Sequence, residues 1–109
     1  MKIVFLIALI STVYSIGCRA NAAEAPQKHI GKFSFNWLAD PASQKCQLVT
    51  ADLASKLAAK HFSCAPSKEP TEAGLKPITC SDPQKTSEYL LFNKKSDCDD
   101  ERKGQAANE

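Results

Sequence analysis

Four cysteines are the residues of this chain whose type and spacing define a chemistry most directly. Cys46, Cys64, Cys80 and Cys98 are 18, 16 and 18 positions apart. A structural zinc site brings two ligands close together, as in C-x2-4-C, and a thioredoxin-like redox site needs C-x-x-C. Neither spacing occurs, whereas four separated cysteines in a short exported chain are typical of disulfides. The sequence therefore predicts two disulfide bonds and no metal site.

Catalytic side chains are scarce beyond these cysteines. The chain has two histidines, His29 and His61. His61 lies three residues before Cys64, so in a strand the two side chains would point to opposite faces and form no Cys–His dyad. The sequence also lacks a nucleophile elbow, an H-E-x-x-H motif and a glycine-rich phosphate loop. We expect a protein that is not an enzyme and uses no cofactor.

A group of carboxylates near the C-terminus is the remaining candidate for chemistry. Asp97, Asp99, Asp100 and Glu101 lie close together, but their spacing differs from the D-x-[DN]-x-[DN]-G pattern of a calcium loop. Acidic side chains are stabilised at the N-terminus of a helix by its dipole. We interpret this group as the solvated start of a helix.

The first 22 residues have the pattern of an export signal. Lys2 precedes an uncharged run, Ile3–Cys18, and Ala20-Asn21-Ala22 supplies the small residues that a signal peptidase requires. The run is shorter than the roughly 18 apolar residues of a membrane-spanning helix. The sequence predicts a signal peptide over residues 1–22, export to the periplasm or out of the cell, and no transmembrane helix after processing.

Cys18 leaves a second route of export open. The segment Ser15-Ile16-Gly17-Cys18 partly resembles a bacterial lipobox, in which the cysteine becomes the acylated first residue of the mature chain. Ser15 departs from this pattern, because leucine is usual there. Membrane anchoring through a lipidated Cys18 is therefore the alternative to a soluble exported protein.

Length and charge limit the partners of the mature chain. The sequence has 109 residues, enough for one small domain, of which 43% are apolar and 24% charged. Of its 14 Lys and Arg residues, Lys2 and Arg19 lie in the export segment, which leaves 12 against 12 Asp and Glu. This balance argues against nucleic acid or an anionic membrane as the main partner. We expect a monomer that binds an unidentified protein or envelope component.

The start of the mature chain predicts an arm followed by a strand. Residues 23–31 show no apolar period and are expected to form a flexible N-terminal arm. In residues 32–38, Phe33, Phe35 and Trp37 alternate with polar side chains. This period of two predicts a half-buried strand with the three aromatic side chains, Trp37 included, on the core face.

The next segment favours the main helix of the domain. Residues 42–60 combine an apolar stripe of helical period with several alanines. Thr50 offers an alternative N-cap for a shorter helix that begins at Ala51.

The second half of the chain predicts strands, a loop and a final helix. Residues 61–65 are a candidate short strand, and 66–77 form a proline-rich loop. Residues 78–81 and 88–92 are expected to pair as a hairpin, with 88–92 in the centre of the sheet because it is apolar on both faces. A capping box that begins at Ser96 predicts a short C-terminal helix.

These elements predict an α+β fold in a single domain over residues 32–109. It would hold a small antiparallel sheet of three or four short strands, one main helix and a short C-terminal helix. Cys80 falls near the hairpin turn and Cys98 beyond its opposite end, more than about 10 Å away, too far for a disulfide. This map favours the pairs Cys64–Cys80 and Cys46–Cys98, while pairing of nearest neighbours stays open.

The loop 66–77 is the candidate surface for a partner. It contains three prolines and is held at both ends by Cys64 and Cys80, so it would lose little entropy on binding. Its charged side chains are the candidate contact residues: Lys68, Glu69, Glu72 and Lys76. We interpret the chain as a small exported binding or accessory protein of the periplasm, envelope or extracellular space. The alternatives are an envelope lipoprotein acylated at Cys18, and a secreted host-directed effector or inhibitor that presents this loop.

Export can be tested by the intact mass of the protein recovered from the exporting cell. We expect a chain that begins at Ala23, with a mass four hydrogens below that of its fully reduced form because two disulfides are closed. A chain that begins at Cys18 with added acyl mass would show the lipoprotein alternative instead. Alkylation of any mature cysteine without a reductant would contradict the disulfide prediction.

Overall fold

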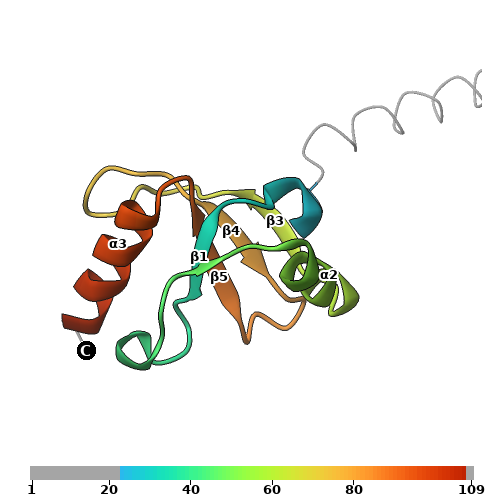
Figure 1. Cartoon of the computed structure of the whole chain (residues 1–109), viewed down its shortest axis with the longest axis horizontal. Helices are drawn as coiled ribbons and strands as arrows, with labels where there is room; N and C mark the ends of the chain where they lie inside the picture. Colours follow the sequence, from blue (N-terminus) through green and yellow to red (C-terminus); the bar gives the residue numbers. More distant parts are fainter. Residues whose placement is uncertain (1–22, 108–109) are drawn as a thin grey trace, which may run out of the picture.

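The computed structural model describes residues 23–107 (Figure 1). The predicted signal peptide, residues 1–22, which includes Cys18 and the expected cleavage site, lies outside the described residues, as do 108–109. The described chain forms a five-stranded antiparallel sheet of order β2-β1-β5-β4-β3, two α-helices and two disulfides. Across residues 23–107, no helix is long and apolar enough to cross a membrane.

The α+β class is confirmed, with five strands in place of three or four. The strands are β1 (Phe33–Asn36), β2 (Gln47–Leu48), β3 (Ser63–Pro66), β4 (Ile78–Ser81) and β5 (Glu88–Phe92). The helices are α2 (Ala51–Ala59) and α3 (Lys95–Ala107), and two 3-10 turns are η1 (Pro26–His29) and η2 (Pro41–Ser43). Strand β5 lies at the centre of the sheet, as its apolar character on both faces predicted.

The predicted helix over 42–60 is wrong in its first half. The helix begins at Ala51, where the Thr50 Oγ1 atom accepts a hydrogen bond from the Leu53 N–H at 3.1 Å. Residues 47–48 are instead extended, because they pair with the outer edge of β1 and satisfy its backbone groups. The fifth strand therefore comes from the segment that the apolar stripe had assigned to the helix.

Helix α2 ends at a residue with left-handed backbone, His61, whose φ is 65°. The N–H groups of His61 and Phe62 donate to the carbonyls of Ala58 (2.9 Å) and Leu57 (3.1 Å), and Phe62 packs in the same apolar cluster as Leu57. These contacts form a Schellman motif, which usually places glycine at this position. The exposed His61 thus terminates a helix, while Cys64 is buried in a disulfide.

Helix α3 is longer than expected. It spans 13 residues against nine for α2, so the relative sizes of the two predicted helices are reversed. It begins at Lys95, which puts Ser96 in its first turn instead of at the N-cap. Asp97 lies in this turn. Asp99 follows it, and the hydrogen bond from Lys95 Nζ (2.8 Å) lowers the pKa of the Asp99 carboxyl.

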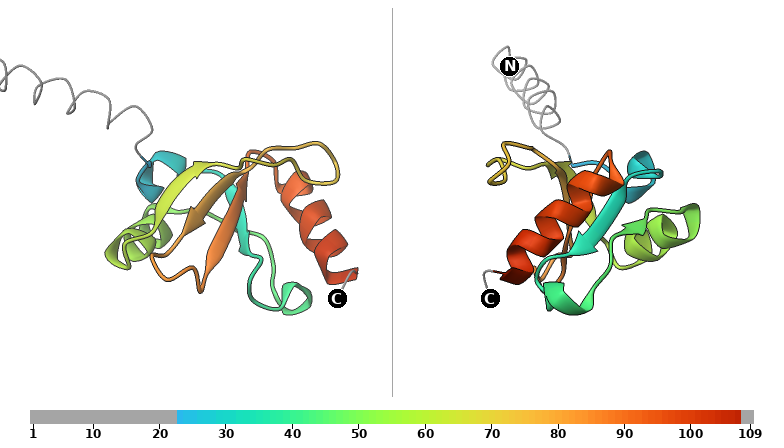
Figure 2. Two further views of the ribbon diagram at one scale, coloured as in Figure 1. Left: turned by 180° about the vertical axis from the view of Figure 1, so that it is seen from behind. Right: turned by 60° about the vertical axis from the view of Figure 1, so that its left-hand side comes forward.

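The sheet carries an apolar cluster on each face, and α2 and α3 lie on different sides of it (Figure 2). Leu91 of β5 packs with Ala54 and Leu57 of α2. The next residue, Phe92, points to the other face and packs with Phe35 and the α3 residue Cys98. The chain therefore divides its small core between two faces of one sheet.

Strand β1 is covered more fully than predicted. Ser34 was expected on the polar face of a half-buried strand, but none of its surface is exposed. The reason is its position, because β1 lies between β2 and β5 and pairs Ser34 with Leu91 on the face that α2 covers.

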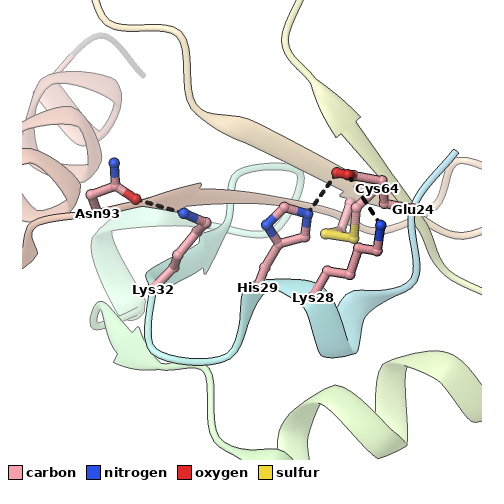
Figure 3. Close-up of polar contacts among 7 residues, drawn as sticks. Glu24, Lys28, His29, Lys32, Cys64 and Asn93 are labelled. Atoms are coloured by element: carbon pink, nitrogen blue, oxygen red, sulfur yellow. Dashed lines mark hydrogen bonds and ion pairs between the residues drawn. A yellow bond between two sulfur atoms is a disulfide. The ribbon is translucent and has the colours of Figure 1, made fainter. Parts of the chain in front are cut away.

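Residues 23–31, predicted to be a flexible arm, are packed against the sheet instead. The backbone of Glu24 exchanges two hydrogen bonds with Cys64, at 2.7 and 2.8 Å, and so adds a bridge to the open edge of β3. Pro26 and His29 of η1 are buried, and η1 contacts α2. Figure 3 shows the His29 ring directed at the Glu24 carboxylate, with His29 Nε2 3.0 Å from Glu24 Oε1. The segment is ordered because it covers both a strand edge and part of the core.

The disulfides join Cys46 to Cys98 and Cys64 to Cys80, the pairing that the strand map favoured. Cys64 and Cys80 face each other across β3 and β4 in the cluster beneath α2. Cys98 of α3 is buried in the second cluster, and Cys46 packs against the same cluster. Each bridge therefore closes one of the two apolar clusters.

The two disulfides should contribute unequally to stability. Their sequence separations are 52 residues for Cys46–Cys98 and 16 for Cys64–Cys80. The chain entropy that they remove from the unfolded state corresponds to about 4 and 3 kcal/mol, respectively. We expect alanine replacement of Cys46 and Cys98 to lower the urea midpoint of unfolding more than alanine replacement of Cys64 and Cys80. Reduction of both disulfides should unfold the domain. A reduced protein that melts within a few degrees of the oxidised one would contradict this.

Candidate binding groove

Helix α3 covers only part of its face of the sheet. It packs on β1 and β5, through Phe35 and Phe92 in the cluster around Cys98. The same face continues across β5 and β4, where Leu90 pairs with Thr79. Beside this uncovered part of the sheet lies a groove of about 510 Å³.

The groove lies between the loop 67–77 and α3. Thr79 and Leu90 form its floor, and Glu101 and Gln105 of α3 line it on one side. On the other side, the loop contributes six residues: Ser67, Lys68, Glu69, Pro70, Thr71 and Pro77. Segments far apart in the sequence thus meet at one hollow.

The loop holds a defined shape through its own hydrogen bonds. Its ends meet where the Ser67 N–H donates to the Pro77 carbonyl at 2.9 Å, and the hydroxyl groups of Ser67 and Thr79 are 2.6 Å apart. Further along, the Leu75 N–H donates to Thr71 Oγ1 (3.2 Å) and the Thr71 N–H to the Leu75 carbonyl (2.8 Å). Leu75 also packs against the cluster of Phe35 and Phe92. The loop is therefore tied at its base and again at its tip.

The structure separates the four charged loop residues predicted as contacts. All four are exposed. Lys68 and Glu69 line the groove, whereas Lys76 lines a smaller hollow of about 110 Å³ that also includes Asp97 of α3. Glu72 lines neither hollow. The groove thus brings together two of these side chains and leaves the other two outside it.

Trp37 also lines this groove, and the prediction that it is buried in the core is wrong. The residue is 39% exposed. Strand β1 ends at Asn36, whose Oδ1 atom accepts hydrogen bonds from the N–H groups of Leu38 (3.1 Å) and Glu88 (3.2 Å). Trp37 continues the alternation of Phe33 and Phe35. It lines the groove, however, instead of packing in the apolar cluster that contains those two residues. The sequence pattern predicted the face of the sheet on which Trp37 lies. It could not predict how far Trp37 is buried, because burial depends on tertiary packing.

Glu88 holds the indole ring of Trp37 in place. The indole N–H donates to Glu88 Oε1 at 2.8 Å, and the Trp37 backbone N–H donates to the Glu88 carbonyl at 3.1 Å. On the α3 side of the groove, Gln105 Nε2 donates to Glu101 Oε2 at 2.9 Å. Both carboxylates are therefore oriented by neighbouring side chains, and sequence reasoning had singled out neither of them for this role.

The lining of the groove is acidic. It includes the carboxylates Glu69, Glu88 and Glu101 against one ammonium group, Lys68. In the part of the chain that the structure describes, the ion pairs use Glu24, Asp52 and Asp99 as their anions, and none of the three groove carboxylates takes part. An acidic groove with an exposed indole can bind a cation.

A second hollow, of about 500 Å³, lies between α2 and the turn that joins β4 to β5. Phe62 and Tyr89 line it, with their ring centres 5.8 Å apart and edge to face. In the turn, the Thr86 hydroxyl donates to Asp82 Oδ2 at 2.6 Å, which lowers the pKa of the Asp82 carboxyl. None of the predicted contact residues lines this hollow, so we take the groove beside the loop as the candidate site.

Residues 23–107 contain no cluster of three side chains suited to hold a metal ion. The chain matches no protein-family model, and it has no significant match among curated proteins or among solved structures. The interpretation of the groove rests on its own residues and geometry.

Fluorescence quenching can test both the exposure of Trp37 and the charge around it, because Trp37 is the only tryptophan of the chain. We expect neutral acrylamide to quench the native protein readily. Cationic caesium should quench more strongly than anionic iodide, each compared with its effect on free N-acetyltryptophanamide, and added salt should reduce this difference. Emission that no quencher reaches would show that the indole is buried. Equal quenching by the two ions would show that the groove is not acidic.

Proposed function

We propose that this protein is a small exported, non-enzymatic binding or accessory protein that holds a partner protein in the groove beside the loop 67–77. The observation that carries this proposal is the groove itself, in which an exposed tryptophan is oriented by Glu88 between a stiff loop and a helix. Tryptophan is among the residues that most often dominate the free energy of protein binding.

The order of the groove favours binding. The loop is closed at its base by the contact between Ser67 and Pro77, and the disulfide Cys64–Cys80 joins the two strands that lead into it. Side chains that are already ordered lose little entropy when a partner binds. This is the advantage expected of a surface whose role is recognition.

Export supports the same proposal. The two disulfides are compatible with an oxidising compartment, where such bridges persist. A soluble exported form agrees with the signal pattern over residues 1–22. An envelope protein anchored through Cys18 and a host-directed effector are the alternatives, and both would use the same groove.

The test compares two variants that carry the same number of substitutions on opposite faces of the sheet. In the groove variant, Trp37→Ala is combined with Glu69→Ala; in the control, Lys56→Ala is combined with Lys60→Ala beside the hollow at α2. Each immobilised protein is incubated with envelope or extracellular extract. We expect wild type and control to retain the same partner and the groove variant to lose it, with an affinity lower by about 2 kcal/mol, roughly thirtyfold.

Circular dichroism and thermal melting verify that all three proteins are folded. Equal capture by the groove variant would contradict the use of this groove. Capture of no partner by wild type from any compartment of the exporting organism or its surroundings would contradict the binding function.

A further inference from the structure

We propose that the groove recognises a positively charged side chain, best supplied by an arginine, in an extended segment of the partner protein. This inference rests on the proposed binding function and adds the chemistry of the occupant. The guanidinium group would stack on the Trp37 indole and contact the carboxylates of Glu88 and Glu101, while its methylene groups lie over Leu90.

Charge complementarity is the first argument for a cation. Three carboxylates and one ammonium group line the groove, in a chain whose acidic and basic side chains balance after residue 22. The local excess of negative charge is therefore a property of this surface and not of the whole domain. Within residues 23–107, Glu69, Glu88 and Glu101 form no ion pair, so none of these carboxylates is in direct contact with a basic side chain.

The arrangement of Trp37 and Glu88 is the second argument. One oxygen of the Glu88 carboxylate, Oε1, accepts the indole N–H at 2.8 Å, so carboxylate and ring are held next to each other. No group of the described residues donates to the second oxygen, Oε2, which is left to bind a ligand. A planar guanidinium group stacks on an aromatic ring and donates hydrogen bonds to carboxylates from its edge. It therefore fits both groups at once.

The α3 side of the groove can contribute a further contact. Glu101 Oε2 accepts a hydrogen bond from Gln105 at 2.9 Å, and this bond orients the carboxylate while Oε1 remains available. The floor between the two sides includes Leu90, which is half-buried. Long basic side chains place their methylene groups over apolar surface and their charge near water. An arginine lying across Leu90 would satisfy both requirements.

A neutral sugar is the main competitor, because sugar rings also stack on tryptophan. The three carboxylates decide against it. Sugar hydroxyl groups can also donate hydrogen bonds to carboxylates, but only a cation compensates the negative charge of the three carboxylates. The occupant of the groove is accordingly expected to be basic.

The test uses the emission of Trp37 as the readout of binding by the whole mature protein. The probe is a five-residue capped peptide, Ser-Gly-Arg-Gly-Ser, with two matched controls that carry citrulline or glutamate in place of arginine. Citrulline keeps the shape of arginine and removes its charge. We expect the arginine peptide to change the emission saturably, the citrulline peptide to bind at least tenfold more weakly, and the glutamate peptide to leave the emission unchanged.

Two variants test the carboxylates against a matched control. Glu69→Gln combined with Glu101→Gln should lower the affinity for the arginine peptide about tenfold. Glu72→Gln removes the same type of charge from the same loop outside the groove, and it should leave binding unchanged. Lys68→Gln removes the one cation of the lining and should strengthen binding. All variants should have the same melting temperature as the wild type, because the substituted side chains are exposed or half-buried.

The outcomes separate this inference from the proposed function. If the groove captures a protein partner while the arginine and citrulline peptides bind equally, or neither binds, the charge-based inference is wrong and the binding function stands. Emission changes caused by cellohexaose and not by the arginine peptide would overturn the inference in favour of a sugar. Loss of partner capture altogether is an outcome of the earlier experiment and would overturn the binding function.

Discussion

The two disulfides fix the two sides of the groove, one bridge for each side. Cys64–Cys80 joins β3 to β4 at the base of the loop 67–77, and Cys46–Cys98 holds the first half of α3 against the chain that leads into β2. Each bridge is also part of one apolar cluster. A chain of this size buries a modest core, so covalent links have a large share in its stability. The shape of the binding surface and the stability of the domain therefore depend on the same four cysteines.

The groove itself follows from the small size of the domain. One sheet with a cluster on each face needs cover on both faces, and the described chain provides one helix for each. On one face α3 covers β1 and β5, and the part of the sheet around Thr79 is left without a helix. The residues there are polar or half-buried, such as Thr79 and Glu88, which lets the surface face water. Incomplete cover by α3 thus creates a surface that a partner can complete.

Local patterns predicted the parts of the fold that depend on neighbouring residues. The central place of β5 followed from its apolar character on both faces, and the hairpin with β4 followed from two apolar runs around a turn. The predictions that were wrong concern segments whose conformation depends on pairing with a strand elsewhere in the sheet. Residues 47–48 are extended because β1 has an open edge, and residues 23–31 are ordered because Glu24 bridges to Cys64. No property of these two segments alone specifies such contacts, since the partner strands lie elsewhere in the sequence.

Trp37 is the position where the sequence pattern and the structure disagree most usefully. The alternation with Phe33 and Phe35 places it on an apolar face, yet the residue is 39% exposed and its indole N–H donates to Glu88. A large aromatic side chain that is exposed but oriented departs from what folding alone favours, and such departures concentrate at functional sites. The unpaired carboxylates beside it depart in the same way, because nearby like charges repel one another in the free protein. A bound cation would reduce that repulsion, so a basic partner would offset part of the cost of assembling these groups in one groove.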